Sequence, residues 1–308
     1  MEIILDKRAG FCYGAGGAVE KANNVILNNK EEKIYCLGEL VHNKQVIDDL
    51  KDKGIIFIDD IDEINERTKE SEKEERKIKL IIRAHGIEKN IYEKASKRNI
   101  ELLDYTCPNV LEVHKIVEEF VNKDYYIVIM GEKSHPETIG TYSFANGRGI
   151  VLEKEEDIKK VVKFIKERSV SKLLIIAQTT FSLEKFNKYV EIIKEILNKE
   201  NANIEIEVRN TICNATKLRQ EETEEISSNV DYMIVIGGKK SANSIKLYEI
   251  SKKNCKNTVF IETYKELEDK VEEITMCSKV GIMAGASTPK KSIDEVIDLL
   301  NSHKIYKS

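Results

Sequence analysis

The chain contains one unit of sequence repeated three times, and this repeat limits the folds open to it more than any other feature. Asp124 begins the segment DYYIVIMGEKSHPE and Asp231 begins DYMIVIGGKKSANS, and the two match at eight of fourteen positions. The segment IYCLGELVHN from Ile34 fits the same template more weakly. A repeated segment indicates one supersecondary unit built several times over, so we expect three similar units of about 100 residues each.

Short apolar runs typical of strands alternate with charged stretches typical of helices along the whole chain. The runs include YYIVIMG, KLLIIAQ and KVGIMAG. Such alternation is typical of α/β proteins, in which helices cover parallel sheets. We therefore predict an α/β fold of three similar domains with parallel sheets in a pseudo-threefold arrangement around a shared central site. The predicted ranges are 13–106 for the first domain, 107–212 for the second, 213–295 with 1–12 for the third, and 296–308 for a C-terminal tail.

Charge and composition exclude several classes of partner. The 50 basic and 54 acidic residues give a net charge of -4, which provides no field that attracts nucleic acid or an anionic membrane. No run approaches the roughly 20 apolar residues of a membrane span. The chain opens on the strand-like MEIILD without a targeting segment, so we expect a cytoplasmic protein. In a reducing cytoplasm its six cysteines would remain thiols, available for metal binding or catalysis.

Three cysteines occupy equivalent places in the repeat. Each precedes a glycine at nearly the same distance, which is 26 residues from Cys12 to Gly38, 24 from Cys107 to Gly131 and 25 from Cys213 to Gly238. Each also stands where a helix is expected to begin, and helix N-terminal amides favour the thiolate that binds metal. Three converging thiolates bind zinc or an iron-sulfur cluster, and we favour the cluster because a first shell of thiolates alone suits it. Cys36, Cys255 and Cys277 are interpreted as small buried apolar residues.

Polar side chains recur where later strands of the repeat end. The distance is 73 residues from Cys12 to His85, 72 from Cys107 to Thr179 and 74 from Cys213 to Ser287. Two further histidines, His42 and His135, follow earlier strands. Ligands of open parallel sheets bind beyond the carboxyl ends of the strands, so these side chains are expected to share one site. With Ser241 and Asn243 they would offer hydrogen-bond donors to a bound phosphate or diphosphate.

Glu137 is the single acidic residue expected among these polar side chains. It follows His135 and Pro136 in the segment SHPET. Burial raises the pKa of a carboxyl group toward neutral pH, where it can act as a general acid. Glu137 is therefore the candidate proton donor of the site.

Eight motifs in order give the chain a specific resemblance to a known family. They are GFCYG at 10–14, ELVHN at 39–43, AHG at 84–86, TCP at 106–108, HPE at 135–137, QTT at 178–180, ICNAT at 212–216 and AGAS at 284–287. Over nearly its whole length the chain resembles the 4-hydroxy-3-methylbut-2-enyl diphosphate reductases, the last enzymes of the non-mevalonate isoprenoid pathway.

The resemblance implies a reaction and a role for each site residue. The family reduces an allylic alcohol diphosphate to isopentenyl diphosphate and dimethylallyl diphosphate, using two electrons, two protons and a [4Fe-4S] cluster with one open iron. It implies that Cys12, Cys107 and Cys213 bind the cluster. It implies that Glu137, Thr179 and His135 form the catalytic group, in which Glu137 delivers protons and Thr179 orients the substrate hydroxyl. It also implies that the diphosphate is held by His42, His85, His135, Ser241, Asn243 and Ser287.

The sequence departs from the family pattern in two places. Ala242 stands where the family usually has a second serine, and we expect Ser244 or a water to compensate for that lost donor. Ala15 follows Gly14, where valine is usual, without removing a cluster ligand.

The sequence shows no dinucleotide-binding motif that would supply electrons. The segment Gly14-Ala15-Gly16-Gly17 lacks the G-x-G-x-x-G spacing of dinucleotide sites, so we expect ferredoxin or flavodoxin as the electron donor.

Two alternative functions stay open at this point. One is another three-cysteine [4Fe-4S] lyase such as quinolinate synthase, and the other is a non-enzymatic binding protein stabilised by a metal.

Overall fold

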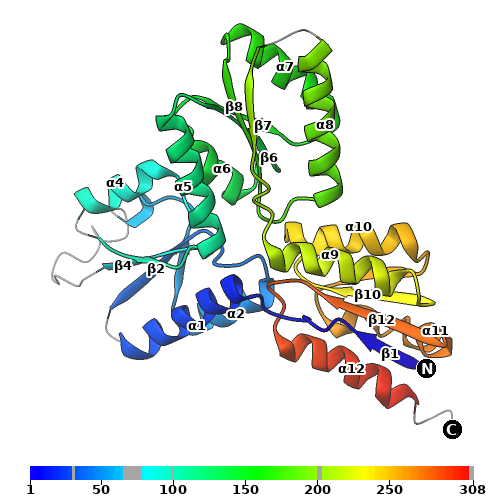
Figure 1. Ribbon diagram of the computed structural model, residues 1–308. Helices are drawn as coiled ribbons and strands as arrows, with labels where there is room; N and C mark the ends of the chain where they lie inside the picture. Colours follow the sequence, from blue (N-terminus) through cyan, green and yellow to red (C-terminus); the bar gives the residue numbers. More distant parts are fainter. Residues whose placement is uncertain (30–31, 65–77, 99, 200–202, 305–308) are drawn as a thin grey trace. The chain divides into compact units, whose positions relative to one another are not determined.

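The computed structural model describes residues 1–29, 32–64, 78–98, 100–199 and 203–304, and over these it contains three four-stranded sheets (Figure 1). All strand pairs in the three sheets are parallel. The predicted α/β class with several parallel sheets is therefore confirmed.

The three sheets share one strand order. The first has the order β3-β2-β4-β5, with β2 (Lys33–Leu37), β3 (Ile56–Ile58), β4 (Ile78–Ile82) and β5 (Glu101–Asp104). The second has the order β7-β6-β8-β9, with β6 (Tyr126–Met130), β7 (Gly149–Leu152), β8 (Lys172–Ala177) and β9 (Glu205–Val208). The third has the order β11-β10-β12-β1, with β10 (Tyr232–Ile236), β11 (Thr258–Ile261), β12 (Lys279–Ala284) and β1 (Glu2–Leu5). The N-terminal strand thus supplies the fourth strand of the third sheet.

Helices connect the parallel strands, as crossovers between them require. The α-helices are α1 (Tyr13–Asn28), α2 (Lys44–Asp52), α4 (Lys89–Lys97), α5 (Pro108–Asn122), α6 (Pro136–Phe144), α7 (Ile158–Glu167), α8 (Leu183–Lys199), α9 (Asn214–Ser227), α10 (Ala242–Asn254), α11 (Val271–Met276) and α12 (Lys290–Lys304). Two 3-10 turns, η1 (Glu155–Asp157) and η2 (Tyr264–Leu267), precede α7 and α11. None of the helices in the described ranges is long and apolar enough to cross a membrane.

The chain divides into two compact units. One unit comprises residues 1–20, 41–52 and 214–308 and contains the third sheet. The other comprises residues 21–40 and 53–213 and contains the first and second sheets. The three predicted domain ranges stay a prediction, although each sheet draws its strands from one of them. The predicted tail from residue 296 is wrong at its start, because α12 continues to Lys304 and buries Val296 and Leu300 in the core.

Buried side chains on both faces explain the uninterrupted apolar strands. In the second sheet, Val128 and Met130 pack with the core beside α7 and α8, while Ile127 and Ile129 belong to the core on the opposite face. The third sheet is likewise covered on both faces. Strands of this kind show no alternation of polar and apolar residues, as is usual for parallel sheets.

Candidate active site

In each sheet an equivalent glycine follows one central strand, which is β2, β6 or β10. The last residues of β2, β6 and β10 pair with the last residues of β4, β8 and β12. The next residue in each case donates its backbone N–H to a carbonyl of the neighbouring edge strand, namely Gly38 to Ile58 (2.7 Å), Gly131 to Leu152 (3.0 Å) and Gly237 to Ile261 (2.9 Å). The predicted equivalent in the third repeat, Gly238, is therefore wrong by one residue.

A candidate substrate-binding side chain follows four residues after each of these glycines. These residues are His42, His135 and Ser241. The Oγ of Ser241 caps α10 by accepting from the N–H of Ser244 (3.3 Å), and Nδ1 of His135 caps α6 by accepting from the N–H of Glu137 (3.2 Å). A neutral imidazole whose Nδ1 accepts carries its proton on Nε2, so His135 retains an N–H donor for a ligand.

The three candidate metal ligands occupy one structural position. Each cysteine directly precedes a helix, α1, α5 or α9, as the sequence predicts. Each donates its backbone N–H to the carbonyl of the second residue after the other central strand, which is β12, β4 or β8. The pairs are Cys12 to Ala286 (2.9 Å), Cys107 to Ala84 (2.9 Å) and Cys213 to Thr179 (3.0 Å). A threefold repeat of one backbone geometry therefore presents three thiols at helix N-termini.

The same geometry corrects the predicted equivalence of Thr179. His85 and Ser287 lie three residues after their strands, whereas Thr179 lies two residues after β8. The equivalent residue in the second sheet is Thr180, whose Oγ1 accepts a hydrogen bond from Nε2 of Gln178 (2.9 Å). Thr179 corresponds instead to Ala84 and Ala286, and its side chain is a feature particular to this repeat.

The surroundings of the six thiols separate them into two groups. Cys12, Cys107 and Cys213 are partly exposed, and Sγ of Cys12 accepts the N–H of Ala15 (3.4 Å). Burial raises the pKa of Cys36 to about 12. The prediction that Cys277 is buried is wrong, because this residue is partly exposed, but desolvation raises its pKa as well. Both thiols therefore stay protonated. Cys255 is buried, and its Sγ donates to the carbonyl of Asn257 (3.4 Å). The donor set therefore fits a cluster held by three thiolates.

Glu137 and Thr179 are joined by two hydrogen bonds. The carboxylate is 2% exposed, and its Oε1 accepts the backbone N–H of Thr179 (2.6 Å) while its Oε2 accepts the hydroxyl of the same residue (2.8 Å). Burial raises the pKa of Glu137 to about 7, against the lowering effect of these two hydrogen bonds. The group therefore titrates near neutral pH, as a general acid requires.

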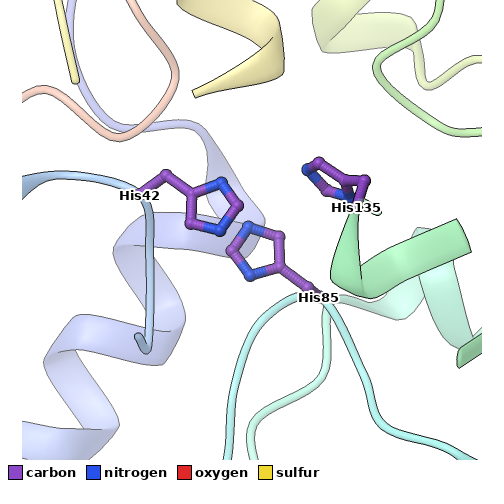
Figure 2. A group of neighbouring side chains, drawn as sticks. All are labelled: His42, His85 and His135. Atoms are coloured by element: carbon purple, nitrogen blue, oxygen red, sulfur yellow. The ribbon is translucent and has the colours of Figure 1, made fainter. Parts of the chain in front are cut away.

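Two candidate histidines meet in the unit that contains Glu137. The rings of His85 and His135 have centroids 5.3 Å apart and stand at 88° to each other. Figure 2 shows the two side chains. His135 also holds the first turn of α6, the helix that carries Glu137. This unit therefore brings together two imidazoles, one carboxyl group and one hydroxyl.

The other unit brings together His42 and Ser287. The hydroxyl of Ser287 donates to the backbone carbonyl of His42 (3.2 Å). A Cβ atom added at Gly238 would lie 2.2 Å from that same carbonyl oxygen. The loops that follow β10 and β12 therefore both contact the backbone of His42.

Asn243 and Ser244 occupy different surroundings at the start of α10. Asn243 is 4% exposed, and among the described residues neither its amide oxygen nor its amide nitrogen has a hydrogen-bond partner. An unsatisfied buried amide is costly, which is consistent with a polar ligand. The hydroxyl of Ser244 is fully buried beside Gly237 and Gly285, where added Cβ atoms would lie 2.3 and 2.0 Å from it. Ser244 therefore packs against the strand ends, and its hydroxyl, like the amide of Asn243, has no hydrogen-bond partner among the described residues. Its role as a compensating donor stays a prediction.

Gln178 is a residue that the sequence interpretation did not assign to the site. It is 3% exposed, and its Oε1 accepts the N–H of Glu132 (3.1 Å) and the hydroxyl of Thr138 (3.3 Å). It thereby joins the strand end that carries Thr179 to the helix that carries Glu137. Its place in the QTT motif was the available signal.

Comparison with known proteins identifies the family. A family model described as LytB protein matches residues 3–301. The chain belongs to the LytB protein family. A relative from Caldanaerobacter subterraneus subsp. tengcongensis, named 4-hydroxy-3-methylbut-2-enyl diphosphate reductase, is 40% identical over 304 residues, which cover 99% of this chain and 98% of the relative. The resemblance inferred from the eight motifs is therefore confirmed.

Solved structures extend the same similarity. A structure described as (E)-4-hydroxy-3-methyl-but-2-enyl diphosphate reductase, the terminal enzyme of the non-mevalonate pathway, is 38% identical with a TM-score of 0.65, and the match covers 98% of this LytB chain and 100% of the other. The E-1-hydroxy-2-methyl-but-2-enyl-4-diphosphate reductase from Plasmodium falciparum is 29% identical with a TM-score of 0.81, and the match covers 97% and 88% of the two chains.

Proposed function

We propose that this LytB protein is the reductase that converts (E)-4-hydroxy-3-methylbut-2-enyl diphosphate to isopentenyl diphosphate and dimethylallyl diphosphate. The observation that carries the proposal is the single backbone geometry shared by Cys12, Cys107 and Cys213 in three sheets of one topology. The relatives named for this reaction align over the whole chain, which also favours it over a quinolinate synthase or a metal-stabilised binding protein.

The three cysteines would hold a [4Fe-4S] cluster. Each of them stands at a helix N-terminus, where backbone N–H groups can donate to a metal-bound sulfur, as the N–H of Ala15 does to Sγ of Cys12. When bound, such a cluster supplies electrons and a Lewis-acidic iron open to substrate. The remaining chemistry falls to protein groups that bind the diphosphate and move protons.

Glu137 donates a proton to the hydroxyl group that leaves the substrate. The hydroxyl of Thr179 lies between the two groups and passes the proton on. The Glu137 pKa of about 7 leaves a large protonated fraction at neutral pH, and the burial of this carboxyl group keeps bulk water away from the proton. The net reaction consumes two electrons and two protons, breaks one C–O bond and releases one water. His135, whose Nδ1 caps the helix of Glu137, holds the backbone of that residue and keeps an Nε2 proton for the diphosphate.

Hydrogen-bond donors of the candidate site would hold the diphosphate. Asn243 supports this role because its buried amide has no protein partner among the described residues. The other members of the proposed set are His42, His85, His135, Ser241 and Ser287. Hydrogen bonds from neutral and charged donors to phosphate oxygens compensate the charge of the ligand without a large net positive field.

A cytoplasmic ferredoxin or flavodoxin is the proposed electron donor. The absence of the G-x-G-x-x-G spacing in Gly14-Ala15-Gly16-Gly17 supports an external donor over a bound nicotinamide.

The proposal is tested by turnover under anaerobic conditions with a chemical reductant, so that no natural donor is required. The full-length protein, reconstituted with iron and sulfide, is mixed with reduced methyl viologen and the allylic diphosphate. We expect isopentenyl and dimethylallyl diphosphate as products. A protein with a full cluster complement that leaves the substrate unchanged would contradict the proposal, as would quinolinate formation from iminoaspartate and dihydroxyacetone phosphate.

A further inference from the structure

We propose that Arg219 is a positioning residue for Cys12, because its guanidinium fixes the backbone of the segment that leads from β1 to this cysteine. Arg219 lies on α9 and is 2% exposed. Its Nη2 donates to the carbonyl of Arg8 (2.7 Å) and to the carbonyl of Gly10 (2.8 Å). Gly10 is two residues from Cys12, so the contact acts directly on the path of the metal-binding segment.

A second residue of α9 holds the preceding part of the same segment. Glu222, one turn after Arg219, accepts the backbone N–H of Lys7 (2.9 Å) through Oε1 and pairs with the guanidinium of Arg8 (2.7 Å) through Oε2. Two charged side chains of one helix thus make four hydrogen bonds to residues 7, 8 and 10. Charge-assisted bonds of this kind are stronger than neutral ones.

The backbone of the segment needs such support. Gly10 has φ +104°, a conformation that side-chain-bearing residues rarely adopt. Phe11 lines a cavity of about 410 Å³ whose other walls include Val46 of α2 and Pro289. The segment is therefore open beside Phe11, while Gly10 is buried and Ala9 packs against the core of the third sheet. The hydrogen bonds from α9 add to this packing.

Cys12 itself is anchored to the loop after β12, because its backbone N–H donates to the carbonyl of Ala286. With that anchor at one end and Arg219 at Gly10, the position of the thiol is set from two elements. The role toward a cluster rests on the proposed function, whereas the clamp on the segment is a property of the chain without metal.

The test compares the reactivity of individual cysteines in the full-length, metal-free chain. Arg219→Met, Arg219→Lys and the control Lys217→Met, an exposed position on the same helix, are labelled briefly with iodoacetamide, and each cysteine is quantified by mass spectrometry. Loss of charge-assisted bonds is expected to raise the labelling of Cys12 relative to Cys107 about tenfold in Arg219→Met. Arg219→Lys, which keeps the charge but reaches fewer acceptors, should show a smaller rise, and Lys217→Met none.

A second measurement uses the reconstituted protein. Iron release to a chelator should be faster in Arg219→Met than in wild type, and Arg219→Lys should recover part of the difference. An unchanged ratio of Cys12 to Cys107 labelling would overturn the proposal, and so would an equal rise at all cysteines, which indicates general unfolding. If Arg219→Met does not fold, Arg219→Lys is judged by the same ratio. Because labelling needs neither cluster nor substrate, its result is independent of whether the proposed reaction is correct.

Discussion

The two carboxylate oxygens of Glu137 are both bound by Thr179, one by its backbone N–H at 2.6 Å and the other by its hydroxyl at 2.8 Å. The pair joins the start of α6 to the loop after β8 within one compact unit. Burial raises the pKa of the carboxyl group to about 7 although both contacts favour its ionised form. Desolvation therefore outweighs hydrogen bonding at this site.

Substitution Glu137→Gln is expected to abolish most of the turnover while leaving the cluster in place. The amide keeps the shape of the side chain but has no proton to donate, and a positioned general acid is worth about 100- to 10,000-fold. The measurement is steady-state turnover beside iron content, with Glu153→Gln at an exposed position as the control. A variant that keeps more than about a tenth of the wild-type rate falls outside that range and would assign the proton to another group.

The difference in the free energy of unfolding between Glu137→Gln and the wild type is expected to depend on pH. The pKa of Glu137 rises from 4.5 in ordinary surroundings to about 7 in the folded chain, so the folded state binds this proton more tightly than the unfolded state. Folding is therefore opposed increasingly as the pH rises from about 4.5 to about 7, by about 3 kcal/mol in full. Urea unfolding of the metal-free chain should show Glu137→Gln gaining stability over wild type across this interval. A difference that does not vary with pH would exclude the raised pKa.

Asn243→Ala should separate ligand binding from stability. Its amide is buried without a protein partner among the described residues, so truncation removes a desolvation cost of about 1 to 3 kcal/mol. We expect the free energy of unfolding of the substrate-free protein to stay equal or increase, while KM for the diphosphate rises about tenfold or more. The control is Asn254→Ala at the other end of α10, where the amide donates to Ser227 (3.1 Å) and truncation should lower stability without changing KM. Equal effects of the two variants on KM would argue against Asn243 as a substrate contact.

Gly238→Ala should disturb His42 through its backbone. The added Cβ would lie 2.2 Å from the carbonyl oxygen of His42, a distance that real contacts do not reach, so one of the two loops must move. We expect a higher KM and a lower midpoint of thermal unfolding. Gly17→Ala is the matched control, since its Cβ meets nothing within 4 Å on α1 and the change should stabilise the helix by about 0.5 to 1 kcal/mol. A normal KM in Gly238→Ala would show that His42 does not depend on this contact.

The repeat and the motifs predicted the class of fold, the helix starts at the cysteines and the family, but the register of the third repeat was wrong. An ungapped alignment pairs Gly131 with Gly238, whereas the hydrogen bonds pair Gly131 with Gly237. The error is possible because β6 and β10 are buried on both faces, so a shift by one residue still matches isoleucine with valine. The equivalence of Thr180 with His85 and Ser287 was missed separately, because Thr179 and Thr180 lie 72 and 73 residues after Cys107 and both fit the spacing of the repeat.

Other features depend on contacts that no local pattern reports. Ser244 stays a predicted donor, but its position was not foreseen: its hydroxyl packs against Gly237 and Gly285, which follow two different strands. Arg219 contacts carbonyl groups more than 200 residues away in sequence (|i−j| = 211 and 209), and an arginine in a charged helix is ordinarily exposed. Such contacts arise from tertiary packing and therefore required the structure.

The central claim is that one repeated geometry makes three of the six cysteines the ligands of a cluster. It is tested most directly by iron and sulfide analysis of the anaerobically reconstituted protein and its six single Cys→Ser variants. We predict about four iron and four sulfide per chain in the wild type and in the variants at Cys36, Cys255 and Cys277. The variants at Cys12, Cys107 and Cys213 should each lose most of both elements together with the visible absorption of the cluster. A normal iron and sulfide content in any of these last three variants would contradict the claim.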